Sequence, residues 1–330
     1  MKSKKTILFI ALIFLLLSLF LLDLAIGSIR ISISDIISIF RGNSDDEILS
    51  EIVLNYRLPK AVTAIVAGSS LSVAGLLMQT LFRNPLADPY ILGVSSGASL
   101  GVAISTMGAF FIPALMGNGW IMIIAAIAGA VIVLLLVLLV SFKVKDIVSL
   151  LIVGIMFGTI AASIVSILQY FSNPDAIKLF VMWTLGSLSS VPWEYLQALL
   201  PVCITGFVIA IFLQKSLNAL LLGEQYANGL GVSVKQTRVL IIVATGLLAG
   251  GVTAFTGPIA FVGVAIPHIA RGLFGTSKHE IIMPACVLCG ASLLLLCDII
   301  SQLPAYTLPI NSISSLFGAP VILWLILKKN

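Results

Sequence analysis

Long uncharged apolar runs, separated by short polar segments, dominate the chain. Uncharged stretches occupy residues 6–22, 61–82, 89–142, 147–174, 195–214, 239–270, 281–297 and 299–327. A membrane-spanning helix needs about 20 apolar residues, so most of these stretches match one span each. Residues 89–142 are long enough for two spans, with the turn formers Pro113, Gly117, Asn118 and Gly119 near their middle. The runs are continuous rather than alternating, which excludes a transmembrane β-barrel.

The stretch 239–270 is long for one helix and short for two. Gly250, Gly251, Gly257 and Pro258 divide it into a full helix and a short one of about 14 residues. Two crossings give ten spans with both chain ends inside, and they place 13 of the 18 Lys and Arg residues on the inner side. One crossing leaves 9 of the 18 inside. Because inner loops carry an excess of Lys and Arg, ten spans are favoured.

The composition agrees with a membrane protein and excludes soluble classes. Hydrophobic residues make up 60% of the chain and charged residues 9%, and the mean hydropathy is +1.19. An average soluble domain carries about 25% charged residues. The prediction is an all-α polytopic membrane protein, a single domain over residues 1–330 that lies in a lipid bilayer and binds no nucleic acid. The N-terminal apolar run also resembles a signal peptide, but the further spans favour a retained first helix.

Two segments on the predicted outer side lie between spans. Residues 27–59 are polar and of mixed charge. Residues 171–194 contain Trp183 and Trp193, and tryptophan is enriched at membrane–water interfaces. This second segment is therefore interpreted as an interfacial helix with aromatic anchors.

The segment 215–237 lies on the predicted inner side and has a helix–turn–helix pattern. Two short helical patterns are separated at Gly223 and end at Gly229 and Gly231. The apolar residues 220–222 lie in this segment although it is outside the bilayer. The pattern fits a docking surface for a partner, and it fits equally a loop helix packed on its own bundle.

The sequence carries no energy source of its own. Charged and histidine residues are absent from the middle of every predicted span, whereas ion-coupled carriers place ionisable groups there. The chain has no Gly-Lys dipeptide, so it lacks the phosphate-binding loop of an ATPase. Cys286 and Cys289 lie in an apolar run and are interpreted as packing residues, and no metal site is expected. Energy for uphill transport would have to come from another subunit.

A resemblance appears at residues 57–99, which include Arg-Asn-Pro-Leu-Ala-Asp-Pro at 83–89. Together with Leu222-Gly223-Glu224, Thr256-Gly257-Pro258 and Pro267-His268-Ile269-Ala270-Arg271, this run closely resembles the FecCD-type permeases of ATP-driven (ABC) importers. The family takes up iron–siderophores, haem and vitamin B12. The resemblance implies a vitamin B12 permease-like fold of ten helices, with a short eighth helix and both termini cytoplasmic. It also implies a multi-pass protein of the prokaryotic plasma (inner) membrane.

The resemblance further implies a transport subunit that is not itself an enzyme. Its partners would be a second permease, identical or different, two cytoplasmic ATPases and an extracytoplasmic substrate-binding protein. The chain would bind no cofactor, and ATP and Mg would lie on the ATPase. Such an importer works by alternating access. The alternative is a secondary carrier or facilitator that no ATPase powers. The substrate stays open between ferric siderophore, haem and cobalamin.

Site residues follow from the same resemblance. The coupling segment that contacts the ATPase would comprise Gly223, Glu224, Gln225, Tyr226, Ala227, Leu230 and Gly231. The binding protein would dock at Arg57 and Lys60, whose alternative interpretation is snorkelling at the membrane interface. The cytoplasmic signature loop comprises Arg83, Asn84, Pro85, Asp88 and Pro89. The chain departs from the family pattern at the outer mouth, at Gln302, Thr307 and Asn311. Candidates for the translocation path are Met78, Gln79, Ser166, Gln169 and Asn311.

Overall fold

The described part of the chain is helical throughout. The computed structural model describes residues 2–27, 29–43, 46–108, 119–144, 147–304 and 306–328, and this part contains no strand. The helices are α1 (Lys2–Ala25), α2 (Ile33–Phe40), α3 (Glu47–Glu51), the π-helix η1 (Ile52–Arg57), α4 (Leu58–Leu81), the 3-10 helix η2 (Pro89–Leu92), α5 (Val94–Met107), α6 (Gly119–Ser141), α7 (Ile147–Phe171), α8 (Pro174–Thr184), α9 (Trp193–Phe212), α10 (Gln214–Leu221), α11 (Glu224–Gly229), α12 (Val234–Thr245), the π-helix η5 (Gly246–Gly250), α13 (Gly251–Thr256), α14 (Val262–Phe274), α15 (His279–Ser301) and α16 (Ile310–Lys328).

The apolar helices match the predicted spans. Within the described ranges, 7 helical stretches are long and apolar enough to cross a membrane, and the shorter apolar helices 94–107, 262–274 and 310–323 account for the remaining predicted spans. The turn predicted around Pro113 to Asn118 lies outside the described residues. The expected interfacial helix is present as α8, capped by the Asn173 side chain, which accepts from the Ala176 amide.

The stretch 239–270 contains a long helix and a short one, as predicted, but the break is in a different place. Gly250 and Gly251 do not interrupt the helix, because α12, η5 and α13 run continuously through a π-helical turn at Gly246–Gly250. The break comes at Gly257, whose φ of 74° favours glycine, followed by Pro258. The short helix α14 then has 13 residues.

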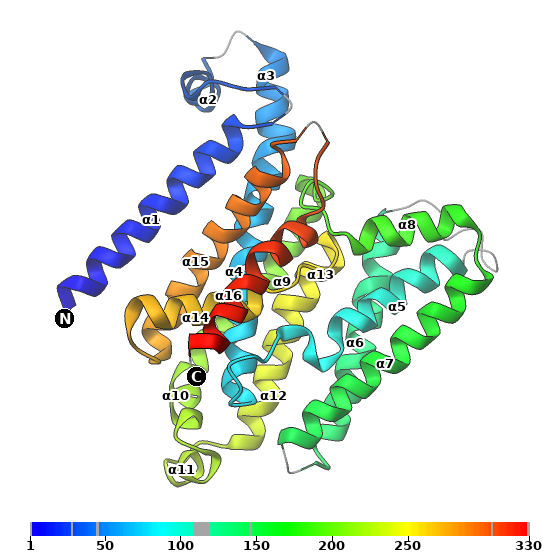
Figure 1. Ribbon diagram of the computed structural model, residues 1–330, viewed down its shortest axis with the longest axis vertical. Helices are drawn as coiled ribbons and strands as arrows, with labels where there is room; N and C mark the ends of the chain where they lie inside the picture. Colours follow the sequence, from blue (N-terminus) through cyan, green and yellow to red (C-terminus); the bar gives the residue numbers. More distant parts are fainter. Residues whose placement is uncertain are drawn as a thin grey trace.

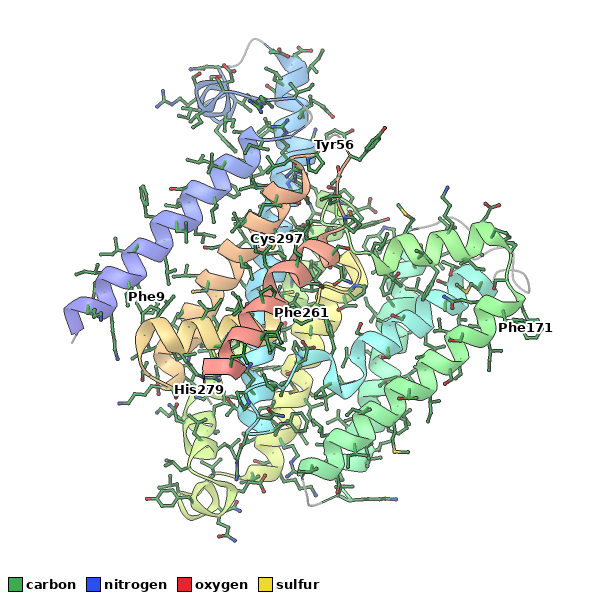
Figure 2. All side chains as sticks on the ribbon, viewed as in Figure 1. Phe9, Tyr56, Phe171, Phe261, His279 and Cys297 are labelled. Carbon is green, nitrogen blue, oxygen red and sulfur yellow. The ribbon has the colours of Figure 1, made fainter. Side chains whose placement is uncertain are left out.

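Helix α4 forms the centre of the bundle. Its spanning window is 83% buried, whereas the window of α1 is 11% buried. A close contact between two glycines allows this packing: a Cβ added at Gly68 would overlap the carbonyl oxygen of Gly290 in α15. Small residues allow such close approach of helices in lipid. Figure 2 shows Cys297 within the bundle and Phe171 at its rim; Phe171 is exposed, and all four cysteines are buried.

The bundle has two distinct ends. Helices α10 and α11 project at one end, and both termini lie in the same half of the molecule (Figure 1). Helices α2, α3 and α8 lie in the other half. The two ends carry the candidate sites described next.

Candidate functional site

The segment 215–237 forms two short helices, as the pattern predicted. They are α10 and α11, separated at Gly223. This glycine has a φ of 116°, and no atom lies within 4 Å of the position that a Cβ would occupy. Leu220 is buried. Leu221, Leu222, Tyr226 and Leu230 are exposed. The helix pair therefore packs through one face and leaves apolar side chains on the other.

The remaining coupling residues divide between surface and interior. Gln225 and Gly231 are exposed, whereas Ala227 is fully buried. The Glu224 carboxylate is partly exposed and lies 3.3 Å from the Arg238 guanidinium. Arg238 is one of the positive charges that the ten-span prediction places on the inner side, and the sequence alone gives it no partner. Two further contacts fix α10: Asn218 Nδ2 donates to Glu280 Oε1 at 2.8 Å, and the His279 amide donates to Asn218 Oδ1 at 3.0 Å.

The signature loop 83–89 is fastened to its neighbours by its own polar groups. Asp88 caps η2 because its Oδ1 accepts from the Tyr90 amide at 2.7 Å. The Tyr90 hydroxyl lies 3.1 Å from Thr253 Oγ1 and accepts from the Ile259 amide at 3.3 Å. Burial raises the pKa of Asp88 to about 6, although the hydrogen bond from Tyr90 acts in the opposite direction.

The first half of the loop faces outward. Arg83, Asn84 and Pro85 are exposed, and Arg83 adopts a φ of 48°. The Pro85 carbonyl oxygen lies 2.8 Å from His268 Nε2 of α14. Pro89 is buried against Gly263. The loop thus joins the end of α4 to α13 and α14, a structural role that its sequence did not reveal.

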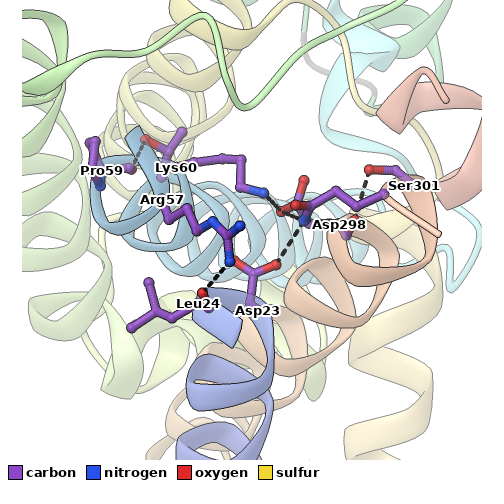
Figure 3. A network of polar contacts seen from close by, with 9 residues as sticks. Asp23, Leu24, Arg57, Pro59, Lys60, Asp298 and Ser301 are labelled. Atoms are coloured by element: carbon purple, nitrogen blue, oxygen red, sulfur yellow. Dashed lines mark hydrogen bonds and ion pairs between the residues drawn. The ribbon is translucent and has the colours of Figure 1, made fainter. Parts of the chain in front are cut away.

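Four charged groups meet at the opposite end of the bundle (Figure 3). Lys60 Nζ forms an ion pair with Asp298 Oδ2 at 2.7 Å. Arg57 Nη1 donates to the Leu24 carbonyl at 2.7 Å, and its Nη2 donates to the Ile29 carbonyl. These contacts connect α1, α4 and α15.

Gln302 completes this charge cluster. Its Nε2 lies 2.8 Å from Asp298 Oδ2 and 3.2 Å from Asp23 Oδ1. Arg57 and Lys60 are each only 6% exposed. Carboxylate and backbone carbonyl oxygens of the same chain satisfy both side chains, and a docking role for them stays a prediction. A cavity of about 600 Å³ opens beside the cluster, and both side chains line it together with Gln302.

The five path candidates do not lie together. Met78 is fully buried in α4, and Gln79 donates to the Val264 carbonyl at 3.1 Å and accepts from Arg271 at 2.7 Å. Ser166 is exposed on α7, and Gln169, one turn further on, is partly buried. Asn311 Oδ1 accepts from the Ala260 amide at 3.0 Å. Gln79 therefore links α4 to α14 by hydrogen bonds, and a path role for any of the five stays a prediction.

The architecture is that of a multi-pass helical membrane protein with a projecting helix pair at one end. The model of the FecCD transport family matches residues 14–328. The chain therefore belongs to the FecCD transport family, and it is a transmembrane permease of the ABC-transporter class.

Relatives and a solved structure support this assignment. The hemin transport system permease protein HmuU of Yersinia pestis is 35% identical over 87% of this chain and 86% of its own length. The vitamin B12 import system permease protein BtuC of Salmonella schwarzengrund is 37% identical over 84% of each chain. A solved structure described as an inward-facing conformation of a metal-chelate type ABC transporter covers 98% of this chain and 99% of its own, with 30% identity and a TM-score of 0.87.

Proposed function

We propose that this chain is the membrane permease of an ATP-driven importer for a chelated metal compound, namely a ferric siderophore, haem or a cobalamin. Family membership carries the proposal. The names of the haem and vitamin B12 relatives support the substrate class, as does the metal-chelate description of the structural neighbour. The substrate would enter as an intact chelate, so the permease needs no metal ligands of its own.

The helix pair α10–α11 is the proposed contact with a cytoplasmic ATPase. Its exposed Leu222, Tyr226 and Leu230 project from the bundle at one end, where an apolar surface that no other part of the described chain covers fits a protein partner. ATP and Mg would bind to that ATPase. Closure of two ATPases would then move two permease subunits, identical or different, as rigid bodies and alternate the access of the path.

The opposite end is the proposed docking face for an extracytoplasmic binding protein. Arg57 and Lys60 are among the residues that line the cavity at this end. Asp298 already neutralises Lys60, and Asp23 lies beside Arg57, so acidic groups of a partner would meet a weaker positive field than two free cations provide. Docking would then depend on the shape of the cavity as well as on charge. The proposed location is the prokaryotic inner membrane.

Reconstitution tests the proposal directly. Liposomes containing the chain, its ATPase and its binding protein should accumulate one of three probes, ferric siderophore, haem or cyanocobalamin, only when ATP is supplied. A secondary carrier is the competing function, and it would transport a probe along an ion gradient without the ATPase. Uptake by the chain alone, driven by such a gradient, would overturn the proposal.

A further inference from the structure

A single buried arginine attaches α11 to the rest of the bundle. Arg238 lies near the start of α12 and is 8% exposed. Its Nη2 lies 3.3 Å from Glu224 Oε1, in the first turn of α11. Its Nη1 donates to the carbonyl oxygen of Val144, which follows α6, at 3.3 Å. One guanidinium therefore connects the consecutive helices α11 and α12 to Val144, which is distant from both in the sequence.

Few other contacts define the orientation of α11. The helix has 6 residues, too few for an isolated helix to be stable in water. The turns on either side, at Gly223 and Gly231, have positive φ angles and no neighbouring atoms where a Cβ would lie. Ala227 is buried, but a methyl group provides little directional restraint. The ion pair between Glu224 and Arg238 is thus a directional side-chain contact that holds α11 against α12.

We propose that Arg238 is a positioning residue that transmits displacement of α11 both to α12 and to Val144, just after α6. The inference rests on the proposed function of α10–α11 as the ATPase contact. Arginine suits this role because its planar guanidinium binds two acceptors in fixed directions at once, whereas a lysine ammonium is a flexible point charge. A lysine at this position would keep the charge but lose the fixed double contact.

The test measures communication between the two ends of the assembled transporter. The complex of permease, ATPase and binding protein is reconstituted in nanodiscs, and ATP hydrolysis is compared with and without binding protein. Arg238→Met is expected to lower this stimulation at least about fivefold, the lower range of measured couplings between sites, with complex recovered in normal yield. Glu224→Gln, on the partly exposed partner, should give a similar loss. Arg238→Lys should restore part of the stimulation.

Non-additivity identifies the ion pair as the cause. Because both single variants break the same contact, Arg238→Met combined with Glu224→Gln should be no worse than Arg238→Met alone. Lys278→Gln is the matched control: it removes an exposed positive charge at the start of α15, outside α11, α12 and the residues that follow α6. This control should keep the stimulation of the unmodified chain.

Three results would overturn the inference. Normal stimulation in Arg238→Met excludes transmission through this residue. An equal loss in Lys278→Gln would indicate a general effect of charge. Loss of assembled complex with unchanged stimulation in the remainder would assign Arg238 a purely structural role. The Tyr226→Ala variant distinguishes these three results from failure of the proposed function. If the ATPase still binds after this exposed ring is removed, α11 is not the ATPase contact.

Discussion

At the residue scale, Asp88 combines a favourable capping bond with an unfavourable burial. Its carboxylate accepts from the Tyr90 amide at 2.7 Å and thereby starts η2. Burial raises its pKa from 3.8 to about 6. Between these two values the folded chain binds more protons than the unfolded chain, so stability falls as the pH rises through this window. Above pH 6 the ionised, half-buried carboxylate opposes folding.

Asp88→Asn should therefore stabilise the protein at pH 7 to 8. The amide oxygen of asparagine still caps η2 and carries no charge to desolvate. We expect a gain of about 1–2 kcal/mol, smaller than a full conversion of the pKa shift because solvent partly screens the side chain. Thermal unfolding of the purified chain at pH 5 and pH 8 measures the difference. Asp88→Ala, which loses the cap, is the control, and an Asn variant that is no more stable than the Ala variant would contradict this account.

The sequence identified some site residues without revealing their surroundings. Arg57 and Lys60 were correctly expected at one end of the bundle, but the sequence did not show that Asp298 pairs with Lys60. That pairing depends on how α4 packs against α15, which helical periodicity does not determine. Arg238 was missed for the same reason. The useful signal was the scarcity of charges, because in so apolar a chain each buried charge needs a partner.

At the element scale, glycine contacts decide which helices touch. Gly68 of α4 lies against Gly290 of α15, and an added Cβ would overlap the carbonyl oxygen there. Gly68→Ala should therefore destabilise the protein by about 1–3 kcal/mol, the usual cost of overpacking. Gly272→Ala in α14 is the matched control, because no atom lies within 4 Å of its added Cβ. The control should be neutral or slightly stabilising, since alanine favours helix.

Unfolding temperatures of the two variants in the same detergent provide the measurement. Equal stability of Gly68→Ala and Gly272→Ala would contradict close packing of α4 on α15. The sequence does show that Ala64, Gly68 and Ser72 lie four residues apart and therefore share one face of a helix. The partner helix is not visible, since many helices carry small residues. The π-helical turn at Gly246–Gly250 was also missed, because hydrophobic patterning does not distinguish it from an α-helix.

At the scale of the whole molecule, the predicted helices form a bundle whose two ends differ in chemistry. One end carries the apolar helix pair α10–α11, and the other carries the buried charge cluster of Lys60 and Asp298. Figure 1 shows both termini in the half that contains α10 and α11. The even number of predicted spans requires such an arrangement. The count was predictable from the apolar runs, whereas the direction of the bundle in the membrane rests on the distribution of Lys and Arg.

That direction can be measured with single cysteines. Leu222 at one end and Ile48 at the other are 64% and 72% exposed, and the four native cysteines are buried, so background labelling should be low. Because inner loops carry more Lys and Arg, a membrane-impermeant maleimide added to intact cells should label Ile48→Cys. Leu222→Cys should react only after permeabilisation. The reverse pattern would invert the bundle and place the proposed ATPase contact on the wrong side, whereas labelling of both from outside would contradict a two-ended membrane-spanning arrangement.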